Sequence, residues 1–279
     1  MTYKQLLKQT IANLQDRELE SSVRFLLLAY CQQANIDLYA DYDLEVDVSI
    51  IDKFHQAVVK LCDNQPLGYI LGYETFYGYD FVVNESVFIP RNETEELVNE
   101  ILMILDESPD QLTGLDIGTG SGVIAITLNK EKPSLAMYAC DISQTALNLA
   151  IENANKLSAS VAFVLSDLFE KIPGNKKFDF IVCNPPYIKN DELLSSSVVD
   201  FEPHTALFGG KDGLDFYRKI LSQAKDYLEP NSFLAFEIGY DQAAAVIAIV
   251  KENFVDAEIE LKQDINGKDR MIFVFNNWR

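Results

Sequence analysis

Apolar residues recur every three or four positions in three stretches near the start of the chain: residues 3–14, 20–34 and 48–62. The third stretch places four apolar side chains on one helical face: Ile51, Phe54, Val58 and Leu61. An acidic, turn-like segment, residues 37–47, precedes it. Because an apolar stripe must pack against neighbouring helices, the pattern predicts a small helical domain over residues 1–66.

After residue 66 the pattern changes to aromatic and β-forming residues. Runs at 69–73 and 76–77 precede a turn at Gly78, and a third run, residues 79–83, follows it. This arrangement predicts a β-hairpin within a connector over residues 67–90.

A helix is predicted next, over residues 93–105. Pro90 and Asn92 precede it, with Asn92 in position to cap the helix and Glu95 in position to return the hydrogen bond.

Strand and helix patterns alternate from residue 112 onward. Apolar runs at 135–140, 161–165, 178–183 and 233–238 are separated by helix-periodic stretches, which predicts βαβ crossovers and a mainly parallel sheet. The last two runs, residues 257–261 and 271–275, flank Asn266-Gly267 and predict an antiparallel edge. The sequence therefore predicts an α/β domain over residues 91–279.

A glycine-rich turn joins the first of these strands to a helix. Its residues are Leu115-Asp116-Ile117-Gly118-Thr119-Gly120-Ser121-Gly122. Such glycines let the backbone approach a ligand closely, and the helix that follows offers free N–H groups and a positive dipole end. Val123 stands where the NAD fingerprint needs its third glycine, and the Gly-Lys-Ser/Thr end of an ATP-binding loop is missing. The pattern is instead typical of S-adenosylmethionine-dependent methyltransferases.

Polar residues end the next two strands. Asp141 is placed to accept hydrogen bonds from ribose hydroxyls, or alternatively to cap the helix that begins nearby. Asp167 and Leu168 follow the third strand, where they could meet the amino group and the face of an adenine, or form a simple loop.

The tetrapeptide Asn184-Pro185-Pro186-Tyr187 follows the fourth strand. The Asn184 side-chain carbonyl and a backbone carbonyl before proline are two acceptors for a planar NH2 group, which indicates group transfer to an amide or amino nitrogen. An ordinary turn has the same composition. Because ligands bind at the carboxyl ends of strands in such sheets, Gly118, Asp141, Asp167 and Asn184 are predicted to converge at one edge.

Composition restricts the function further. The formal net charge is −20, with 43 acidic and 23 basic residues among 279, so nucleic acid is a poor partner unless a local basic face exists. Four scattered cysteines and two histidines predict reduced core thiols and argue against a metal site. Without an apolar run of membrane-spanning length, we expect a cytoplasmic protein that does not enter membranes.

Several motifs together resemble the protein-(glutamine-N5) methyltransferases that modify peptide chain release factors. Besides the two motifs above they are Gln65–Gly72, Phe88–Arg91, Phe201–Pro203, Gly209–Leu214, Glu237–Gly239 and Gly267–Arg270. Asn92 departs from the family, which usually has proline after the Pro-Arg pair.

The resemblance implies a Rossmann-like, S-adenosylmethionine-dependent methyltransferase domain after a helical domain and a hairpin. It also implies a substrate, the glutamine of the Gly-Gly-Gln loop of release factors. Cofactor binding would fall to Gly118, Thr119, Gly120, Ser121, Gly122, Asp141, Asp167, Leu168 and Asn184. Substrate binding would fall to Asn184, Pro185, Pro186 and Tyr187, with catalysis assigned to Asn184, Pro185 and Tyr187.

Two alternatives use the same motifs. An N6-adenine nucleic-acid methyltransferase would clamp a flipped base with Asn184–Tyr187, but it would need a basic cleft. A protein that binds S-adenosylmethionine without turnover would act as an interaction module. The segment 189–212 lacks periodicity and is predicted to form a lid over the substrate loop, or a long connection.

Overall fold

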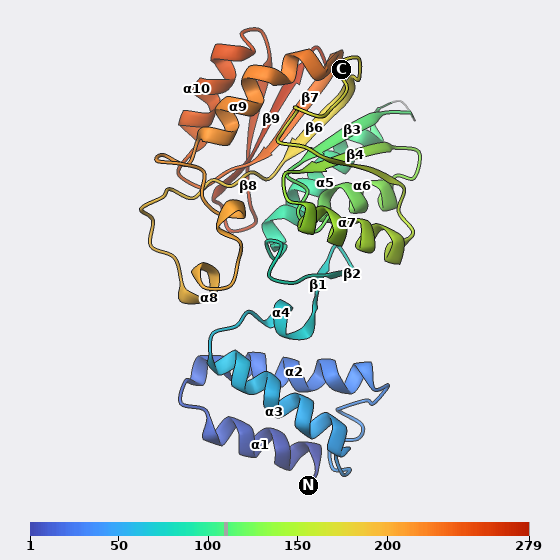
Figure 1. Ribbon diagram of the computed structural model, residues 1–279, viewed down its shortest axis with the longest axis vertical. Coiled ribbons are helices and arrows are strands. Elements are labelled where there is room, and N and C mark those ends of the chain that lie inside the picture. Colours follow the sequence, from blue (N-terminus) through green and yellow to red (C-terminus); the bar gives the residue numbers. More distant parts are fainter. Residues whose placement is uncertain (109–110, 279) are drawn as a thin grey trace. The chain divides into compact units, whose positions relative to one another are not determined.

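The computed structural model describes residues 1–108 and 111–278 (Figure 1). Residue 279, the predicted end of the α/β domain, lies outside the described residues. The chain divides into two compact units, which are described separately. Unit 1 contains Met1–Tyr73 and Leu194–Phe201, and unit 2 contains Glu74–Leu193 and Glu202–Arg279.

Unit 1 is helical, as its periodicity predicts. Its elements are α1 (Tyr3–Asn13), a short 3-10 helix (Arg17–Leu19), α2 (Glu20–Gln33), α3 (Val48–Cys62), α4 (Leu67–Leu71) and α8 (Ser196–Val199). The side chains of Leu6, Leu26 and Phe54 are fully buried in its core. Thr2 and Gln5 form a reciprocal capping box at the start of α1, which satisfies backbone N–H groups there.

The prediction of a β-run at 69–73 is wrong for residues 69–71, which belong to α4. Pro66 precedes this helix, and its fixed φ suits a helix start. Gly72 ends it in the left-handed conformation, with φ of 80°. A helix of five residues is too short to show periodicity, so its aromatic content was misleading.

Unit 2 contains a two-stranded hairpin and a seven-stranded sheet. The hairpin pairs β1 (Tyr73–Phe76) with β2 (Tyr79–Val82). The sheet consists of β3 (Thr113–Ile117), β4 (Ala136–Asp141), β5 (Val161–Leu165), β6 (Phe178–Cys183), β7 (Leu228–Glu237), β8 (Glu258–Gln263) and β9 (Asp269–Asn276). Its order is β5-β4-β3-β6-β7-β9-β8. The pairs from β5 to β7 are parallel, while β9 is antiparallel to both β7 and β8. The predicted fold class is confirmed.

Helices cover both faces of this sheet (Figure 1). They are α5 (Asn92–Asp106), α6 (Val123–Glu131), α7 (Gln144–Leu157), α9 (Asp215–Ala224) and α10 (Ala243–Asn253). Alternate residues of β6 face different clusters, because successive side chains of a strand point to opposite sides. Ile181 and Cys183 pack with α9 and α10, whereas Phe180 and Val182 pack with α5 and α6.

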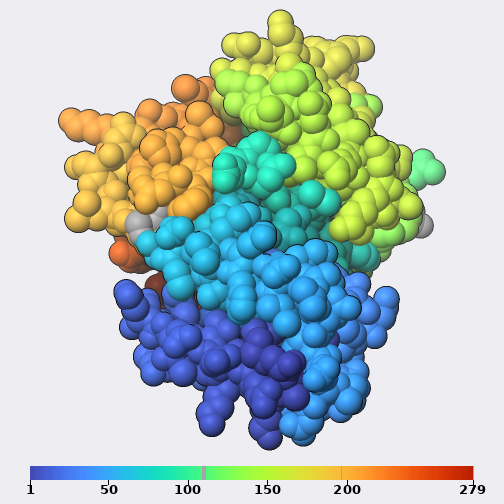
Figure 2. All heavy atoms as spheres, turned by 60° about the horizontal axis from the view of Figure 1, so that its bottom comes forward, coloured from blue at the N-terminus to red at the C-terminus, as the bar shows by residue number. Residues whose placement is uncertain are grey.

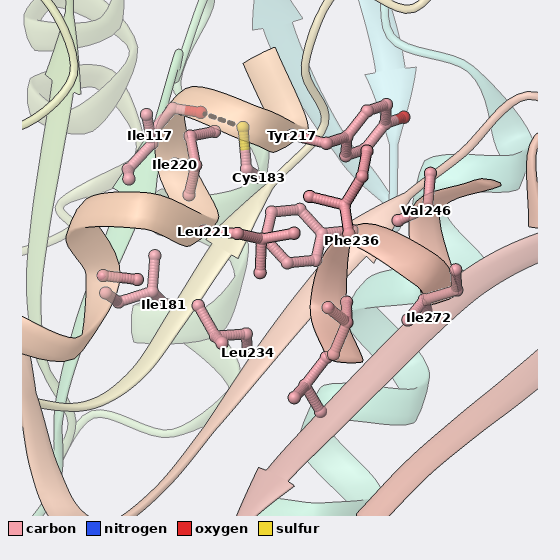
Figure 3. Packing of buried hydrophobic residues seen from close by; sticks show 14 of the residues in the cluster. Ile117, Ile181, Cys183, Tyr217, Ile220, Leu221, Leu234, Phe236, Val246 and Ile272 are labelled. Atoms are coloured by element: carbon pink, nitrogen blue, oxygen red, sulfur yellow. Dashed lines mark hydrogen bonds between the residues drawn. The ribbon is translucent and has the colours of Figure 1, made fainter. Parts of the chain in front are cut away.

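Figure 3 shows the first of these clusters, with Tyr217 and Leu221 of α9 close to Phe236 of β7. There the Cys183 thiol donates to the carbonyl oxygen of Ile117 at 3.0 Å. This bond ties together the ends of two adjacent strands, β6 and β3.

Asn92 does not cap α5, contrary to prediction. The helix begins at Asn92, the capping position falls on Arg91, and Arg91 makes no side-chain capping bond. Glu95 instead accepts from the backbone N–H of Tyr77 at 2.7 Å. Tyr77 has φ of 51° in the hairpin turn, so its N–H needs an acceptor outside the hairpin ladder. Among the described residues, no helix is long and apolar enough to cross a membrane.

Candidate functional site

The carboxyl ends of β3, β4, β5 and β6 lie side by side in the sheet, and a cavity of about 440 Å³ opens there. Residues from all four strand ends line it, including Gly118, Asp141, Asp167 and Asn184. The predicted convergence therefore occurs. The segment after the hairpin, around Phe88, contributes another wall. In Figure 2 the teal atoms of this part of the chain lie between the yellow-green region that contains α7 and the orange region after residue 200.

The glycine turn has the backbone that its sequence predicts. Gly118, Gly120 and Gly122 have φ of 72°, 56° and 86°, which side chains disfavour. A Cβ atom on Gly118 or Gly120 would meet nothing within 4 Å, so these two positions leave open space beside the turn. A Cβ atom on Gly122 would approach Ile126 of α6 to 2.7 Å, which shows that this glycine serves packing.

Asp116 hydrogen-bonds to this turn and to the helix that follows it. Its Oδ2 accepts from the Thr119 hydroxyl at 2.6 Å and from the N–H of Ala125 at 3.3 Å, so it caps α6 internally. Its Oδ1 is buried and has no hydrogen-bond partner. Burial of this carboxyl raises its pKa from 3.8 to about 7.

Asp141 joins β4 to the glycine turn. Its Oδ2 accepts from the N–H of Gly120 at 2.9 Å, and its Oδ1 accepts from the N–H of Ser143 at 2.8 Å. Ser143, rather than Asp141, caps α7 through its hydroxyl. Burial raises the pKa of Asp141. Each carboxylate oxygen has two lone pairs, so acceptor capacity for a ligand hydroxyl remains.

Asp167 and Leu168 also reach the cavity wall. Asp167 is exposed. Leu168 has φ of 47°, and its carbonyl oxygen accepts from the Ser166 hydroxyl at 2.9 Å. A loop fixed in this way presents one carboxylate and one apolar side chain to the cavity, and their contacts with an adenine stay a prediction.

Asn184 is fixed by two buried residues that sequence reasoning did not assign to the site. Its amide nitrogen Nδ2 donates to the Thr94 hydroxyl at 3.1 Å, and that hydroxyl donates to the Glu237 carboxylate at 2.6 Å. The amide nitrogen faces this chain of bonds, so the carbonyl oxygen Oδ1 is the end of the side chain that can accept from a ligand. Burial raises the pKa of Glu237 from 4.5 to about 7, and Thr94 and Arg270 act in the opposite direction.

A sequence signal for Glu237 exists, because an acidic residue ends the apolar strand β7 at the sheet edge where the ligand is expected. Thr94 carries no comparable signal, since a threonine in the first turn of a helix is ordinary.

Two glycines lie so close to the backbone of Pro186 and Tyr187 that there is no room for a side chain. A Cβ atom on Gly209 would lie 2.4 Å from the Pro186 carbonyl oxygen, and one on Gly213 would lie 2.2 Å from that of Tyr187. Gln242 donates to the Tyr187 carbonyl oxygen at 2.9 Å. Burial raises the pKa of the Tyr187 phenol, so it stays protonated at neutral pH.

The chain after the tetrapeptide folds back and hydrogen-bonds to Ile188. The N–H of Ile188 donates to Leu207 O at 3.0 Å, and the N–H of Gly209 donates to Ile188 O at 2.8 Å. Glu202, almost fully buried, accepts from the N–H of Ile89 at 3.2 Å and pairs with Arg91. Within unit 2 this part of the predicted lid is therefore hydrogen-bonded to the cavity wall.

The geometry agrees with comparisons to known proteins. Residues 5–72 match the family model of the PrmC N-terminal domain, and residues 91–201 match that of the methyltransferase small domain. The chain is 43% identical over 225 residues to the release factor glutamine methyltransferase of Bacillus cereus, covering 79% of this chain and 80% of that one. It is 36% identical to that of Staphylococcus aureus over 98% of both chains. A solved methyltransferase from Pyrococcus furiosus, 18% identical, shares the fold with a TM-score of 0.53, over 80% of this chain and 99% of that one.

Proposed function

This chain belongs to the release factor glutamine methyltransferase family, and we propose that it methylates the side-chain nitrogen N5 of the glutamine in the Gly-Gly-Gln loop of a release factor. The methyl donor is S-adenosylmethionine. The observation that carries the proposal is the orientation of Asn184, whose amide nitrogen bonds to Thr94 and whose carbonyl oxygen is left to accept.

The cavity fits the donor. Its volume of about 440 Å³ lies in the range of small-molecule sites. Gly118 and Gly120 leave space for close approach to the backbone, Asp141 retains lone pairs for ribose hydroxyls, and Leu168 offers an apolar face. We propose that these residues, with Thr119, Ser121, Gly122, Asp167 and Asn184, bind S-adenosylmethionine, which supplies an electrophilic methyl group on a sulfonium.

The substrate nitrogen needs orientation more than activation. An amide nitrogen is a weak nucleophile because its lone pair is delocalised into the carbonyl group. Acceptors at Asn184 Oδ1 and at the Pro185 carbonyl would bind both N–H bonds and direct the lone pair towards the methyl carbon. Orientation of this kind supplies about 7 kcal/mol or more in well-aligned intramolecular reactions. The nitrogen–carbon bond forms as the carbon–sulfur bond breaks, and the amide proton is then lost to water.

Tyr187 closes the site on one side. Because its phenol remains protonated, it presents a neutral, flat ring that can pack on the substrate amide and exclude water. Its carbonyl oxygen is fixed by Gln242, so the position of the ring is set by the backbone as well as by packing.

The test is mass spectrometry of a release factor after incubation with the protein and S-adenosylmethionine. We expect one added methyl group on the glutamine of the Gly-Gly-Gln peptide, and a loss of about 100-fold in kcat for Asn184→Ala because the acceptor is removed. Asn148→Ala, on the exposed side of α7, is the control and should match the wild type.

Isothermal titration with S-adenosylmethionine separates donor binding from transfer. Methylated adenine in nucleic acid without methylated glutamine would contradict the proposal. So would donor binding without any turnover.

A further inference from the structure

Three side chains from three elements form a buried chain of hydrogen bonds behind the substrate position. They are Asn184 after β6, Thr94 in the first turn of α5 and Glu237 at the end of β7. Thr94 and Glu237 are each 2% exposed. In sequence Thr94 is 143 residues from Glu237 and 90 from Asn184, so only the folded chain brings them together.

The direction of each bond follows from the donors available. A threonine hydroxyl has one proton, and a carboxylate has none. Since the Glu237 carboxylate can only accept, the Thr94 proton points to it over 2.6 Å. The Thr94 oxygen must then accept from Asn184, and only the Asn184 amide nitrogen can donate to it. The Asn184 side chain also lowers the pKa of Glu237, as a neighbouring donor does.

We propose that Thr94 and Glu237 are positioning residues that set the polarity of the Asn184 amide, holding its NH2 group inward and its carbonyl oxygen towards the substrate. This inference rests on the proposed function and deepens it. With the opposite polarity, Asn184 would present donors to a substrate NH2 group that itself only donates. The amide pair would then repel rather than align.

A protonated Glu237 would permit that opposite polarity. Its own O–H could donate to Thr94, and the Thr94 proton would then be free to point at the Asn184 carbonyl oxygen. Burial raises the Glu237 pKa to about 7, so both states are accessible near neutrality. We therefore expect kcat to fall as the pH drops through about 7, because the carboxylate form is needed.

The charged and titratable groups that face Glu237 come from several elements. Arg270 on β9 stabilises the carboxylate and Glu93 on α5 opposes it. Tyr217 on α9, Cys183 at the end of β6 and Tyr187 in the turn after it also interact with Glu237. Each of these three groups stays neutral because burial raises its pKa. Arg270 is thus the charged group that favours the active state.

The first experiment compares threonine variants. Thr94→Val keeps the shape but removes the hydroxyl, and we expect kcat for the release factor to fall about 100-fold, the loss typical of a misaligned reacting group. Donor affinity should change much less than kcat, because the glycine turn and Asp141 are untouched. Thr94→Ser should restore kcat, because it restores the hydroxyl. Thr127→Val is the matched control, since Thr127 is a buried threonine of α6 whose hydroxyl has no hydrogen-bond partner.

The second experiment is the pH profile. The wild type should lose kcat as the pH falls from about 8.5 to 6, whereas Glu237→Gln should be less active at pH 8.5 and lose the part of this pH dependence that comes from Glu237. Asp116, which also titrates near 7, is present in both proteins, so their difference isolates Glu237. An unchanged kcat in Thr94→Val, or the same pH profile in Glu237→Gln and the wild type, would overturn the proposal.

A third measurement does not depend on turnover. The side-chain NH2 protons of Asn184, followed by NMR, should exchange slowly in the wild type and faster in Thr94→Val. Equal exchange would show that Thr94 does not hold the amide. If the wild type fails to methylate a release factor but shows this protection, the proposed function is wrong while the polarity of Asn184 stands.

Discussion

Gly213 packs against the Asn184–Tyr187 turn because it has no side chain, and Gly213→Ala should test this. Gly213 has φ of 75°, and a Cβ atom there would lie 2.2 Å from the Tyr187 carbonyl oxygen and 2.5 Å from Gln242 Nε2. The contact with the carbonyl cannot be relieved by a rotamer change, because it involves backbone. The Asn184–Tyr187 turn must therefore move, or the segment around Gly213 must.

Gly267→Ala is the matched control. Gly267 has the same φ of 75°, but a Cβ atom there would meet nothing within 4 Å. In both variants the left-handed conformation of an alanine lowers the free energy of unfolding by about 1–2 kcal/mol, partly offset by the lower entropy of the unfolded chain. Only in Gly213→Ala does overpacking lower it further, by about 1–3 kcal/mol.

Urea unfolding should therefore show Gly213→Ala less stable than Gly267→Ala by about 1–3 kcal/mol at an unchanged m-value. We expect its kcat to fall by about 100-fold, since a displacement of roughly 1 Å at the reacting centre has that effect. Equal stability of the two variants, together with wild-type kcat for Gly213→Ala, would refute the idea that this glycine positions Tyr187.

Two further predictions concern buried polar groups. Burial raises the Asp116 pKa from 3.8 to about 7, so the folded state binds this proton more tightly than the unfolded state, and stability should fall as the pH rises from about 4 to 7. Asp116→Asn should reduce this fall in the free energy of unfolding by an amount on the order of 4 kcal/mol. Urea unfolding at several pH values measures it, and the same pH dependence in the variant and the wild type would contradict the assignment. Asn153, fully buried, bonds to Val82 N at 2.7 Å, Val82 O at 3.0 Å and Ser121 O at 2.9 Å. Asn153→Leu should cost about 2–4 kcal/mol by leaving these groups unpaired, and titration should show weaker binding of S-adenosylmethionine; wild-type stability would show that water replaces the amide.

The hydrophobic pattern predicted most of the strands and helices, for a physical reason. Each long element buries one face, so its period is written into the sequence, and α3, β5 and β6 have the predicted bounds. An element without a buried face of sufficient length was missed: the helix α4 has only five residues. The helix α5 was predicted, but its cap was not, because Glu95 accepts from the hairpin instead of bonding back to the helix start.

The cofactor side of the site was predictable because its parts are local. A glycine turn shows in the sequence since φ near 70° demands glycine, and an acidic residue after a strand shows by its place. The roles of these residues remain predictions. The order of the strands does not show in the same way. The pair β8 and β9 was predicted as an antiparallel edge, but the position of β9 between β7 and β8 is set by packing over the whole sheet.

The substrate side could not be predicted to the same depth, because its specificity depends on polarity transmitted through buried bonds. Asn184 alone has an ambiguous amide, with a donor end and an acceptor end of nearly the same shape. Glu237 fixes the direction of the Thr94 hydroxyl proton, so the Thr94 oxygen can only accept. This in turn fixes which end of the Asn184 amide faces Thr94. Burial of a carboxylate is unfavourable, and here the buried carboxylate holds one amide in a defined orientation at the proposed point of methyl transfer. The buried carboxylate of β7 is thus the residue of that strand most closely tied to the proposed chemistry.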